Sequence, residues 1–440
     1  MVTKRVKLGF GIGDIGGNLF FTIMGFYLLY FLTDVVHLSA ALAGTAIMIG
    51  KIWDAITDPI TGYISDKTPT RWGRRRPYMF VGSIISFFAM GWIFTKPSTQ
   101  HQMSLFIYFT LMYCLLNTAF TLVNIPYAAL LPELSDDYHQ RTILTGYRMS
   151  FAVVGTFLGA GAVMPLVNLF VDVQRGWTIM GYLMGAIMLF STLITIWAIK
   201  EPANPVIPDH KGFIRTYKEA LKSRVFLSAL ISWTLFIIGA TMVQGALVYY
   251  FATIYGNEAL FQLALLALLA VALLCIPIWV KISKKLGKKN CYIIGMAIMS
   301  AAVMVFSLLG EQIGPQGAVI IMALAGSGLS THYVMPHAIL PDVVEYDALL
   351  HGSKRREGVF SSLWTFFSKV GQALALALNG WLLTLFAYVP NQPSSLSVIG
   401  IKIMCGPAPF IWFALGIIIL WFYPIDQHYY QQMLDRKEFA

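Results

Sequence analysis

The chain has 440 residues, of which 57% are hydrophobic and only 12% are charged, and its formal net charge is +10. Soluble domains usually carry about twice that fraction of charged residues, so the composition excludes an ordinary soluble protein and indicates an integral membrane protein. Long apolar runs, rather than short alternating segments, favour membrane helices over a β-barrel. The length is sufficient for about a dozen spans of roughly 20 residues each.

The apolar runs predict twelve membrane-spanning helices in an all-α fold. A polar stretch at 200–223, with three prolines and a basic run, divides them into an N-terminal six-helix lobe at 1–199 and a C-terminal six-helix lobe at 224–440. The first run is too long for a signal-peptide core, so we expect it to be a span. The predicted spans lie near 8–35, 40–64, 77–96, 103–131, 145–171, 177–199, 224–252, 258–280, 291–309, 316–340, 358–387 and 396–423.

The basic residues are distributed asymmetrically over this topology. Of the 31 Lys and Arg, 25 fall in loops on the side of the N-terminus, and three fall on the opposite side. The remaining three, Lys51, Arg148 and Lys369, lie inside predicted spans. The positive-inside rule therefore predicts that both termini are cytoplasmic. The excess of basic over acidic residues reflects membrane topology, so we expect no nucleic-acid partner.

The two halves of the chain contain related segments six spans apart. The segment 124–133, Asn-Ile-Pro-Tyr-Ala-Ala-Leu-Leu-Pro-Glu, resembles the segment 334–342, Val-Met-Pro-His-Ala-Ile-Leu-Pro-Asp. The basic loop at 62–76 has a weaker counterpart at 284–289. Parallel repeats of six spans are typical of a two-lobed secondary transporter with its substrate site between the lobes. No Gly-rich nucleotide-binding loop is present, so we do not expect ATP to drive transport directly.

Two acids, Asp54 and Asp58, lie four residues apart in the second predicted span. This spacing places both side chains on one helix face. A carboxylate at membrane depth costs at least a few kcal/mol, and two adjacent carboxylates repel unless a cation, a proton or a basic side chain joins them. The pair therefore predicts half of a cation site.

The sequence contains no arrangement suited to covalent chemistry. Cys114, Cys275, Cys291 and Cys405 all lie in apolar stretches without metal-ligand spacing, so we expect buried free thiols. There is no nucleophile–base pattern, and an intramembrane protease built on the acid pair would leave the repeats unexplained. We expect no enzyme activity and no cofactor.

The loop after the second span carries the pattern Gly62-x-x-x-Asp66-Lys67, followed by Gly73-Arg74-Arg75. It resembles the loop motif of the major facilitator superfamily, with longer spacing. We interpret Asp66, Arg74 and Arg75 as a charged gating latch at a helix end. The alternative is a plain positive-inside loop, which accounts for the arginines but not for Asp66 or the glycines.

Several motifs together resemble the glycoside–pentoside–hexuronide:cation symporter family. They are Thr33-Asp34-Val-Val, the run from Trp53 to Gly62 with its Asp-x-x-x-Asp-Pro core, Arg71-Trp-Gly73, Asn124-Ile-Pro-Tyr127 and Lys369. The resemblance extends from the first span to the eleventh. It implies a twelve-helix carrier of the bacterial inner membrane that moves a sugar together with Na⁺, Li⁺ or H⁺ by alternating access.

The resemblance also implies which residues bind the cation. The family's positions correspond to Asp54, Asp58 and Thr121, whose oxygens suit a hard ion such as Na⁺. Thr57 stands where sodium-using members have an asparagine, which leaves open whether the coupling ion is Na⁺ or H⁺. A salt bridge from either acid to Lys51 or Lys369, without a bound ion, is the alternative.

For the substrate, the family's positions correspond to Asn18, Asn124, Arg148 and Lys369, with Thr365 and Gln372 on turns beside Lys369. Trp364 is our candidate for stacking on a sugar. Family members that take neutral sugars have acids at the first two positions. In this chain asparagines replace both acids, while the basic Arg148 and Lys369 are present. This balance of charge favours an anionic glycoside such as a hexuronide. Alternatively, Arg148 and Lys369 are counter-ions of the acid pair. Asp14 is interpreted as a cytoplasmic gate, with helix packing or substrate contact as alternatives.

Two other functions stay open at this point. A lysophospholipid symporter, a relative of the family, shares the acid pair, and there Arg148 and Lys369 would meet a phosphate headgroup. A non-transporting receptor that has kept the fold is the third possibility. We expect the protein to act as a monomer in the bilayer, with a glycoside and a monovalent cation as its partners.

Overall fold

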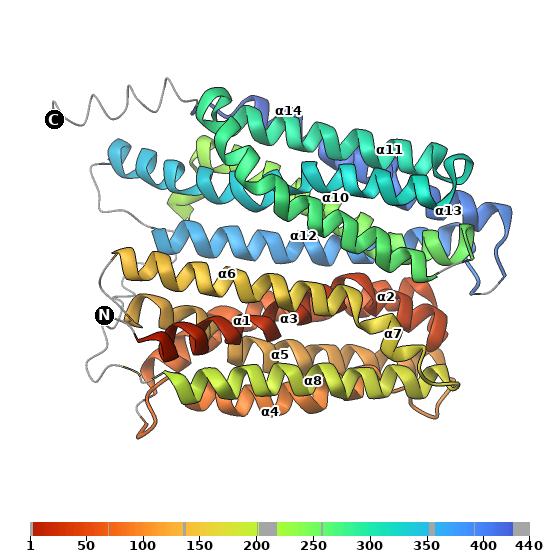
Figure 1. The fold of residues 1–440 in the computed structure, drawn as a ribbon, viewed down its shortest axis with the longest axis horizontal. Coiled ribbons are helices and arrows are strands. Elements are labelled where there is room, and N and C mark those ends of the chain that lie inside the picture. The colour runs from red at the N-terminus through yellow and green to blue at the C-terminus, as the bar shows by residue number, and fades with distance from the viewer. Residues whose placement is uncertain are drawn as a thin grey trace. The chain divides into compact units, whose positions relative to one another are not determined.

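The computed structural model describes residues 3–68, 70–134, 138–199, 201, 218–256, 258–351, 357–390 and 392–425, and in these residues it contains helices and no strands (Figure 1). Most of the linker predicted at 200–223 lies outside the described residues. The chain divides into two compact units. Unit 1 comprises Met1–Pro208 with Tyr388–Gln392, and unit 2 comprises Asp209–Ala387 with Pro393–Ala440.

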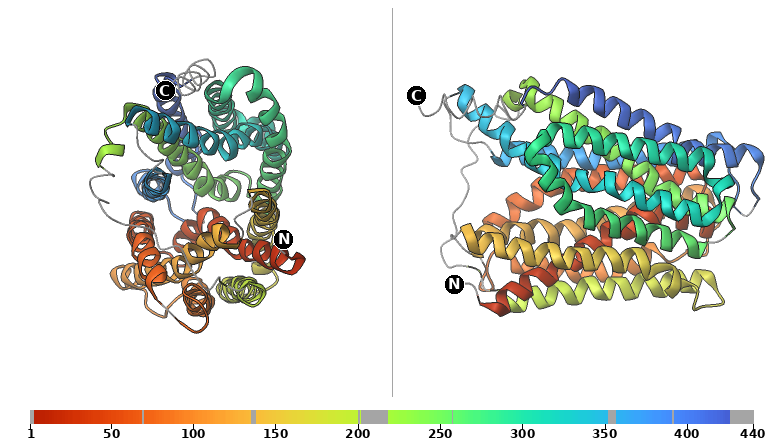
Figure 2. Two further views of the ribbon diagram at one scale, coloured as in Figure 1. Left: turned by 90° about the vertical axis from the view of Figure 1, so that its left-hand side faces the viewer. Right: turned by 45° about the horizontal axis from the view of Figure 1, so that its top comes forward.

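Unit 1 contains helices that run side by side within the unit (Figures 1 and 2). In it, α1 packs against α6 and α8, α3 packs against α5, and α4 packs against α5 and α8. The helices of unit 1 are α1 (Lys4–Phe26), α2 (Leu28–Tyr30), the π-helix η1 (Phe31–Val35), α3 (Ala40–Lys67), α4 (Arg76–Ile93), α5 (Gln102–Leu134), α6 (Tyr138–Gly161), α7 (Val163–Val167) and α8 (Val173–Ala198).

In unit 2, α10 packs against α11, α12, α13 and α14, and α11 packs against α14. The helices of unit 2 are α10 (Arg224–Ile254), α11 (Glu258–His351), α12 (Glu357–Leu385), α13 (Ser395–Cys405) and α14 (Pro407–Trp421). Non-helical backbone at Gly287 and Gly314 divides α11 into three helical segments. These segments match the spans predicted at 258–280, 291–309 and 316–340.

Seven described helices are long and apolar enough to cross a membrane, or eight if α1 and the α2–η1 segment count as one bent span. The bend between these two segments is 48°, and the apolar pattern at 8–35 did not predict it. The fifth span is likewise interrupted between α6 and α7, and the twelfth at Gly406. With the three segments of α11, the helices are consistent with twelve spans.

The core of unit 1 ties five helices together near the start of α1. Phe10 stacks on Tyr127 with 4.9 Å between ring centroids, and the Tyr127 hydroxyl donates a 2.6 Å hydrogen bond to the Phe10 carbonyl. Met79, Leu144 and Ile196 complete this buried cluster. Tyr127, in the repeated segment, therefore holds α5 against α1.

The four cysteines are free thiols, as predicted, but their burial differs. Cys291 and Cys405 are buried, whereas Cys114 and Cys275 are only half-buried.

Candidate functional site

Asp54 and Asp58 lie one turn apart on α3, and their side chains meet Thr121 of α5. The Thr121 hydroxyl oxygen is 3.0 Å from Oδ1 of Asp54 and 3.0 Å from Oδ1 of Asp58. Asp54 is fully buried and Thr121 is 1% exposed, while Asp58 is half-buried. A hydroxyl carries one proton and can donate to one acceptor at a time. The Thr121 hydroxyl therefore donates to one of the two carboxylates at a time, and the three residues form a cluster of oxygens.

The meeting of these side chains follows from a constant register between α3 and α5. Near their starts, the backbone N–H of Ser39 donates to Oε1 of Gln102. Further along, the Gly50 backbone lies directly against the ring of Tyr113, and Gly62 lies opposite Ile125. Each pair is 63 residues apart, as are Asp58 and Thr121. The two helices thus run in the same direction in step.

A second polar cluster in unit 1 joins α1 and α6. Nε of Arg148 lies 3.2 Å from Oδ1 of Asp14, and the Asn18 amide donates to Oδ2 of Asp14 at 3.2 Å. The Arg148 guanidinium also lies over the Tyr127 ring, 5.2 Å from its centroid. Asp14 and Asn18, assigned from the sequence to gating and to substrate binding, therefore belong to one hydrogen-bonded group. In it, Arg148 has Asp14 as an ion-pair partner.

A cavity in unit 1 opens beside this second cluster. Its polar lining comes from α1, α4, α5 and α8, and includes Asn124, which the sequence assigned to substrate binding. The lining residues are Gly13, Asp14, Gly16, Gly17, Ser83, Ser86, Phe120, Val123, Asn124, Tyr127, Met188 and Thr192.

An aromatic pair packs at the wall of this cavity. Phe120, which lines the cavity and precedes Thr121 in α5, stacks on Phe20 of α1 at 4.2 Å. The buried Lys51 ammonium lies 5.8 Å from the Phe20 ring centroid and 5.3 Å from that of Phe21.

The other predicted substrate residues lie on α12 in unit 2. Trp364 is buried and stacks on Trp233 at 5.3 Å, so its indole is already covered on one face. Lys369 is 6% exposed. Thr365 is exposed, and its hydroxyl donates to the Ser361 carbonyl; the Gln372 amide donates to the Ser368 hydroxyl.

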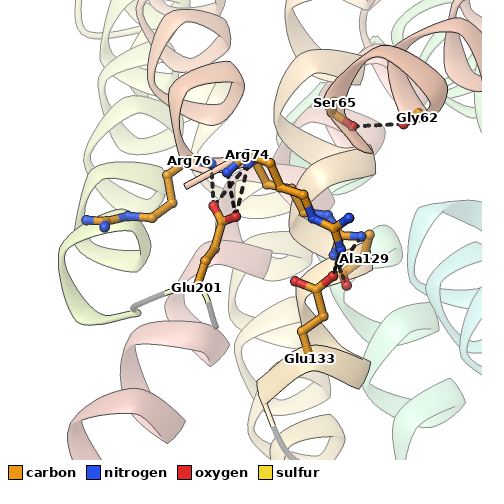
Figure 3. A network of polar contacts seen from close by, with 8 residues as sticks. Gly62, Ser65, Arg74, Arg76, Ala129, Glu133 and Glu201 are labelled. Carbon is orange, nitrogen blue, oxygen red and sulfur yellow. Dashed lines mark hydrogen bonds and ion pairs between the residues drawn. The ribbon is translucent and has the colours of Figure 1, made fainter. Parts of the chain in front are cut away.

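The basic loop before α4 forms a network of buried ion pairs, which we call the first latch (Figure 3). Arg74 and Arg75, 7% and 5% exposed, both pair with Glu133 at the end of α5. The Arg75 guanidinium also donates to the carbonyl of Ala129, one turn before Glu133. The side chain of Asp66, the acid that the motif predicted for this latch, lies outside the described part of the structure.

Glu201 completes the first latch from the far end of unit 1. Its carboxylate accepts hydrogen bonds from the backbone N–H groups of Arg74, Arg75 and Arg76, at 2.7, 3.0 and 2.8 Å. Figure 3 shows this carboxylate against the backbone that leads into α4. A carboxylate at a helix N-terminus satisfies unpaired donors and complements the helix dipole. Glu201 thereby ties the end of α8 to the start of α4.

Unit 2 contains a second latch with the same plan. Nζ of Lys288 lies 2.8 and 2.7 Å from the two carboxylate oxygens of Asp342, and it donates to the Ala338 carbonyl, one turn before Asp342, at 3.0 Å. The two echoes detected in the sequence are therefore contact partners in each half: the basic loop binds the acid that ends the repeated segment.

Sequence reasoning missed Glu201 and Asn117. Glu201 contacts residues 125 to 127 positions earlier, a separation that no local pattern reveals. Asn117 is a fully buried amide on α5, one turn before Thr121. Its spacing of four residues from Thr121, which puts both on one face of α5, was the signal available for it.

Comparisons with known proteins place the chain in a family. A family model described as MFS/sugar transport protein matches residues 9–427. An uncharacterized symporter from Synechocystis sp. is 30% identical, over 96% of this chain and 94% of that protein. A glucuronide carrier protein homolog from Escherichia coli is 26% identical over 98% and 94%, and a sodium-dependent lysophosphatidylcholine symporter from Gallus gallus is 25% identical over 96% and 86%.

Among solved structures, a D-xylose-proton symporter matches with a TM-score of 0.72 at 15% identity, over 97% of this chain and 99% of that one. This likeness shows the fold. The chain belongs to the MFS/sugar transport protein family of the major facilitator superfamily. It is a multi-pass membrane transporter of the symporter type, coupled to a cation, and not an enzyme.

Proposed function

We propose that the protein is a symporter that couples uptake of a glycoside to Na⁺ or H⁺ by alternating access, with Asp54, Asp58 and Thr121 as the cation site. The observation that carries this proposal is the Thr121 hydroxyl held 3.0 Å from both carboxylates. A cation bound there offsets the repulsion of the two acids, and its presence or absence changes the charge of this cluster. Coupling requires that cation and substrate each favour binding of the other.

Uptake by the reconstituted transporter tests the cation site. In proteoliposomes with an imposed Na⁺ or H⁺ gradient, Asp54→Asn and Asp58→Asn should abolish accumulation of substrate above equilibrium, while exchange of substrate across the membrane can persist. The matched control is Asp172→Asn, because Asp172 is an exposed acid whose capping role at the start of α8 asparagine can take over. Wild-type accumulation by either acid-pair variant would refute the assignment.

For the substrate, we propose a glycoside and retain an anionic one as the favoured class. The glucuronide carrier homolog supports this choice. The ion pair between Arg148 and Asp14 sets a condition, because Arg148 must divide its charge between Asp14 and a substrate carboxylate. Lys369, Asn18, Asn124, Trp364, Thr365 and Gln372 remain proposed contacts.

Competition assays decide between the substrate classes. We expect p-nitrophenyl β-glucuronide to compete better than p-nitrophenyl β-glucoside, and Asp14→Asn to strengthen the glucuronide because it releases Arg148. Arg148→Gln should weaken the glucuronide and leave the glucoside nearly unchanged. Preference of the wild type for the neutral glucoside would refute the anionic class.

A lysophospholipid is the second candidate substrate, supported by the relative from Gallus gallus. Lysophosphatidylcholine included in the same competition assay would then displace the bound probe, and both glycosides would fail. We further propose that the protein acts as a monomer in a bacterial inner membrane with both termini cytoplasmic. Reporter fusions at each terminus test the topology, and light scattering of the purified protein tests the monomer.

A further inference from the structure

Asn117 on α5 is a buried amide with an unused acceptor. It is 0% exposed. Its Nδ2 donates a 2.9 Å hydrogen bond to the carbonyl of Tyr113, one turn earlier. Within the described residues, its Oδ1 has no hydrogen-bond partner. A buried amide oxygen without a partner loses its hydration and destabilises the folded state, so a ligand that binds it would offset that loss.

The hydrogen bond to Tyr113 fixes the direction of the amide. A backbone carbonyl can only accept, so the nitrogen of Asn117 must face it and the oxygen must face away. The opposite assignment would set two oxygens against each other. The atom of Asn117 that is directed away from its own helix backbone is therefore the acceptor.

The register of the two helices brings Asn117 level with Asp54. Two contacts of the same register, 63 residues apart in sequence, flank the level of Asp54 and Asn117. They join Gly50 to Tyr113 and Asp58 to Thr121. Asp54 and Asn117 have the same separation and lie one turn from each flanking pair. Tyr113 and Asn117, one turn apart, share a face of α5, and Tyr113 packs against Gly50, one turn before Asp54.

We propose that Oδ1 of Asn117 is a further ligand of the cation held by Asp54, Asp58 and Thr121, and that the ion is a dehydrated Na⁺ or Li⁺ rather than a proton. This inference rests on the proposed function and deepens it. Two carboxylates, one amide oxygen and one hydroxyl form an oxygen set that matches a small hard cation. A proton shared by two acids needs no third or fourth oxygen.

Two features of the site agree with a monovalent metal ion. Thr57, the residue between the acids, donates its hydroxyl hydrogen to the Asp54 carbonyl at 3.2 Å, so α5 supplies the neutral amide oxygen instead. The site thus combines two charged with two neutral oxygens, a low charge for a divalent ion.

Cation binding to the purified full-length transporter tests the assignment. The probes are NaCl and LiCl in a choline chloride background, and the readouts are the thermal midpoint in detergent and the Na⁺ concentration for half-maximal uptake. Asn117→Ala should raise the half-saturating Na⁺ concentration about tenfold or more, the loss expected when a group that supports a metal site is removed. Asn117→Asp, which retains an oxygen, should lose much less.

Asn379 supplies a matched control. It is also fully buried, its amide donates to the Met242 carbonyl at 2.9 Å, and its Oδ1 also has no partner among the described residues. Asn379→Ala removes the same kind of group from unit 2 and should leave the Na⁺ requirement unchanged. Tyr113→Phe should likewise leave it unchanged, which excludes a role for Asn117 that acts through the phenol.

The outcomes separate this inference from the proposed function. If Asn117→Ala and Asn117→Ser, each verified as folded by gel filtration, keep the wild-type Na⁺ dependence while Asp58→Asn abolishes coupling, the inference is overturned and the symporter proposal stands. Coupling to protons with no effect of Na⁺ or Li⁺ also overturns it. If Asp54→Asn and Asp58→Asn retain full coupling, the proposed function itself fails.

Discussion

The two latches share one plan but differ in their surroundings. In each, a glycine with positive φ precedes a basic run: Gly73, at +104°, is followed by three arginines, and Gly287, at +78°, by two lysines. In each, a basic side chain binds an acid and the carbonyl one turn before that acid. The first latch uses arginines that are 7% and 5% exposed, whereas the Lys288 side chain of the second is 40% exposed.

From this difference we infer that the repeated segments determine which residues pair, while burial determines how much each ion pair contributes to stability. The planar guanidinium of Arg75 contacts a carboxylate and a carbonyl at the same time, and Glu201 adds three backbone hydrogen bonds to the first latch. Lys288 presents a point charge that water can reach. We therefore expect the second latch to open at a much smaller cost than the first during a transport cycle.

Removing the acid of each latch should give the largest contrast. Glu133→Ala leaves two buried guanidinium groups without that partner and should cost about 3–5 kcal/mol of stability. Asp342→Ala leaves an ammonium group that can be hydrated and should cost about 1 kcal/mol or less. Unfolding of the purified variants by sodium dodecyl sulfate measures both. Equal losses would show that exposure does not distinguish the latches; Glu133→Gln and Asp342→Asn serve as isosteric controls.

Replacing each latch glycine by alanine should give a smaller difference in stability, again with the larger loss in the first latch. At Gly287 no atom lies within 4 Å of an added Cβ, so Gly287→Ala should cost only the backbone strain of about 1–2 kcal/mol. At Gly73 the Cβ would lie 2.5 Å from the Glu201 carboxyl carbon. Gly73→Ala should therefore also displace this cap, which adds about 1 kcal/mol.

The same unfolding measurement, repeated with Glu201→Ala as background, tests the cause. In that background the extra loss at Gly73 should disappear, because the carboxylate that meets the new methyl group is absent. An extra loss that persists would assign the effect to the backbone rather than to Glu201.

The sequence predicted the helical membrane fold because the bilayer requires long apolar runs, and it predicted the acid pair because a helix period places Asp54 and Asp58 together. Thr121 came from the family resemblance, since the register between α3 and α5 depends on side-chain packing such as Gly50 against Tyr113. The contacts of Glu201 escaped prediction because its partners lie 125 to 127 positions earlier in the chain, and no local period encodes them.

The smallest contrast concerns the last basic residue of each loop. Lys289 donates to the carbonyls of Trp421 and Tyr423 at the end of α14, at 2.8 and 2.7 Å. Arg76 makes a longer 3.4 Å bond to the Trp72 carbonyl. A cation at a helix C-terminus contributes about 0.3–1 kcal/mol, so Lys289→Ala should lower stability by that amount. Arg76→Ala should change it by no more than about 0.5 kcal/mol.

Here the larger stability loss is expected in unit 2, whereas removal of the latch acids should destabilise unit 1 more. The comparison therefore tests whether the local contacts or the unit as a whole determine the stability loss. Lys289→Arg keeps the charge and the donors and should behave as wild type. Because the interaction is electrostatic and near the surface, 1 M salt should reduce the Lys289→Ala loss, while the Glu133→Ala loss should be nearly unaffected. A larger loss for Arg76→Ala than for Lys289→Ala would mean that unit 1 is more sensitive throughout, whatever the local contacts.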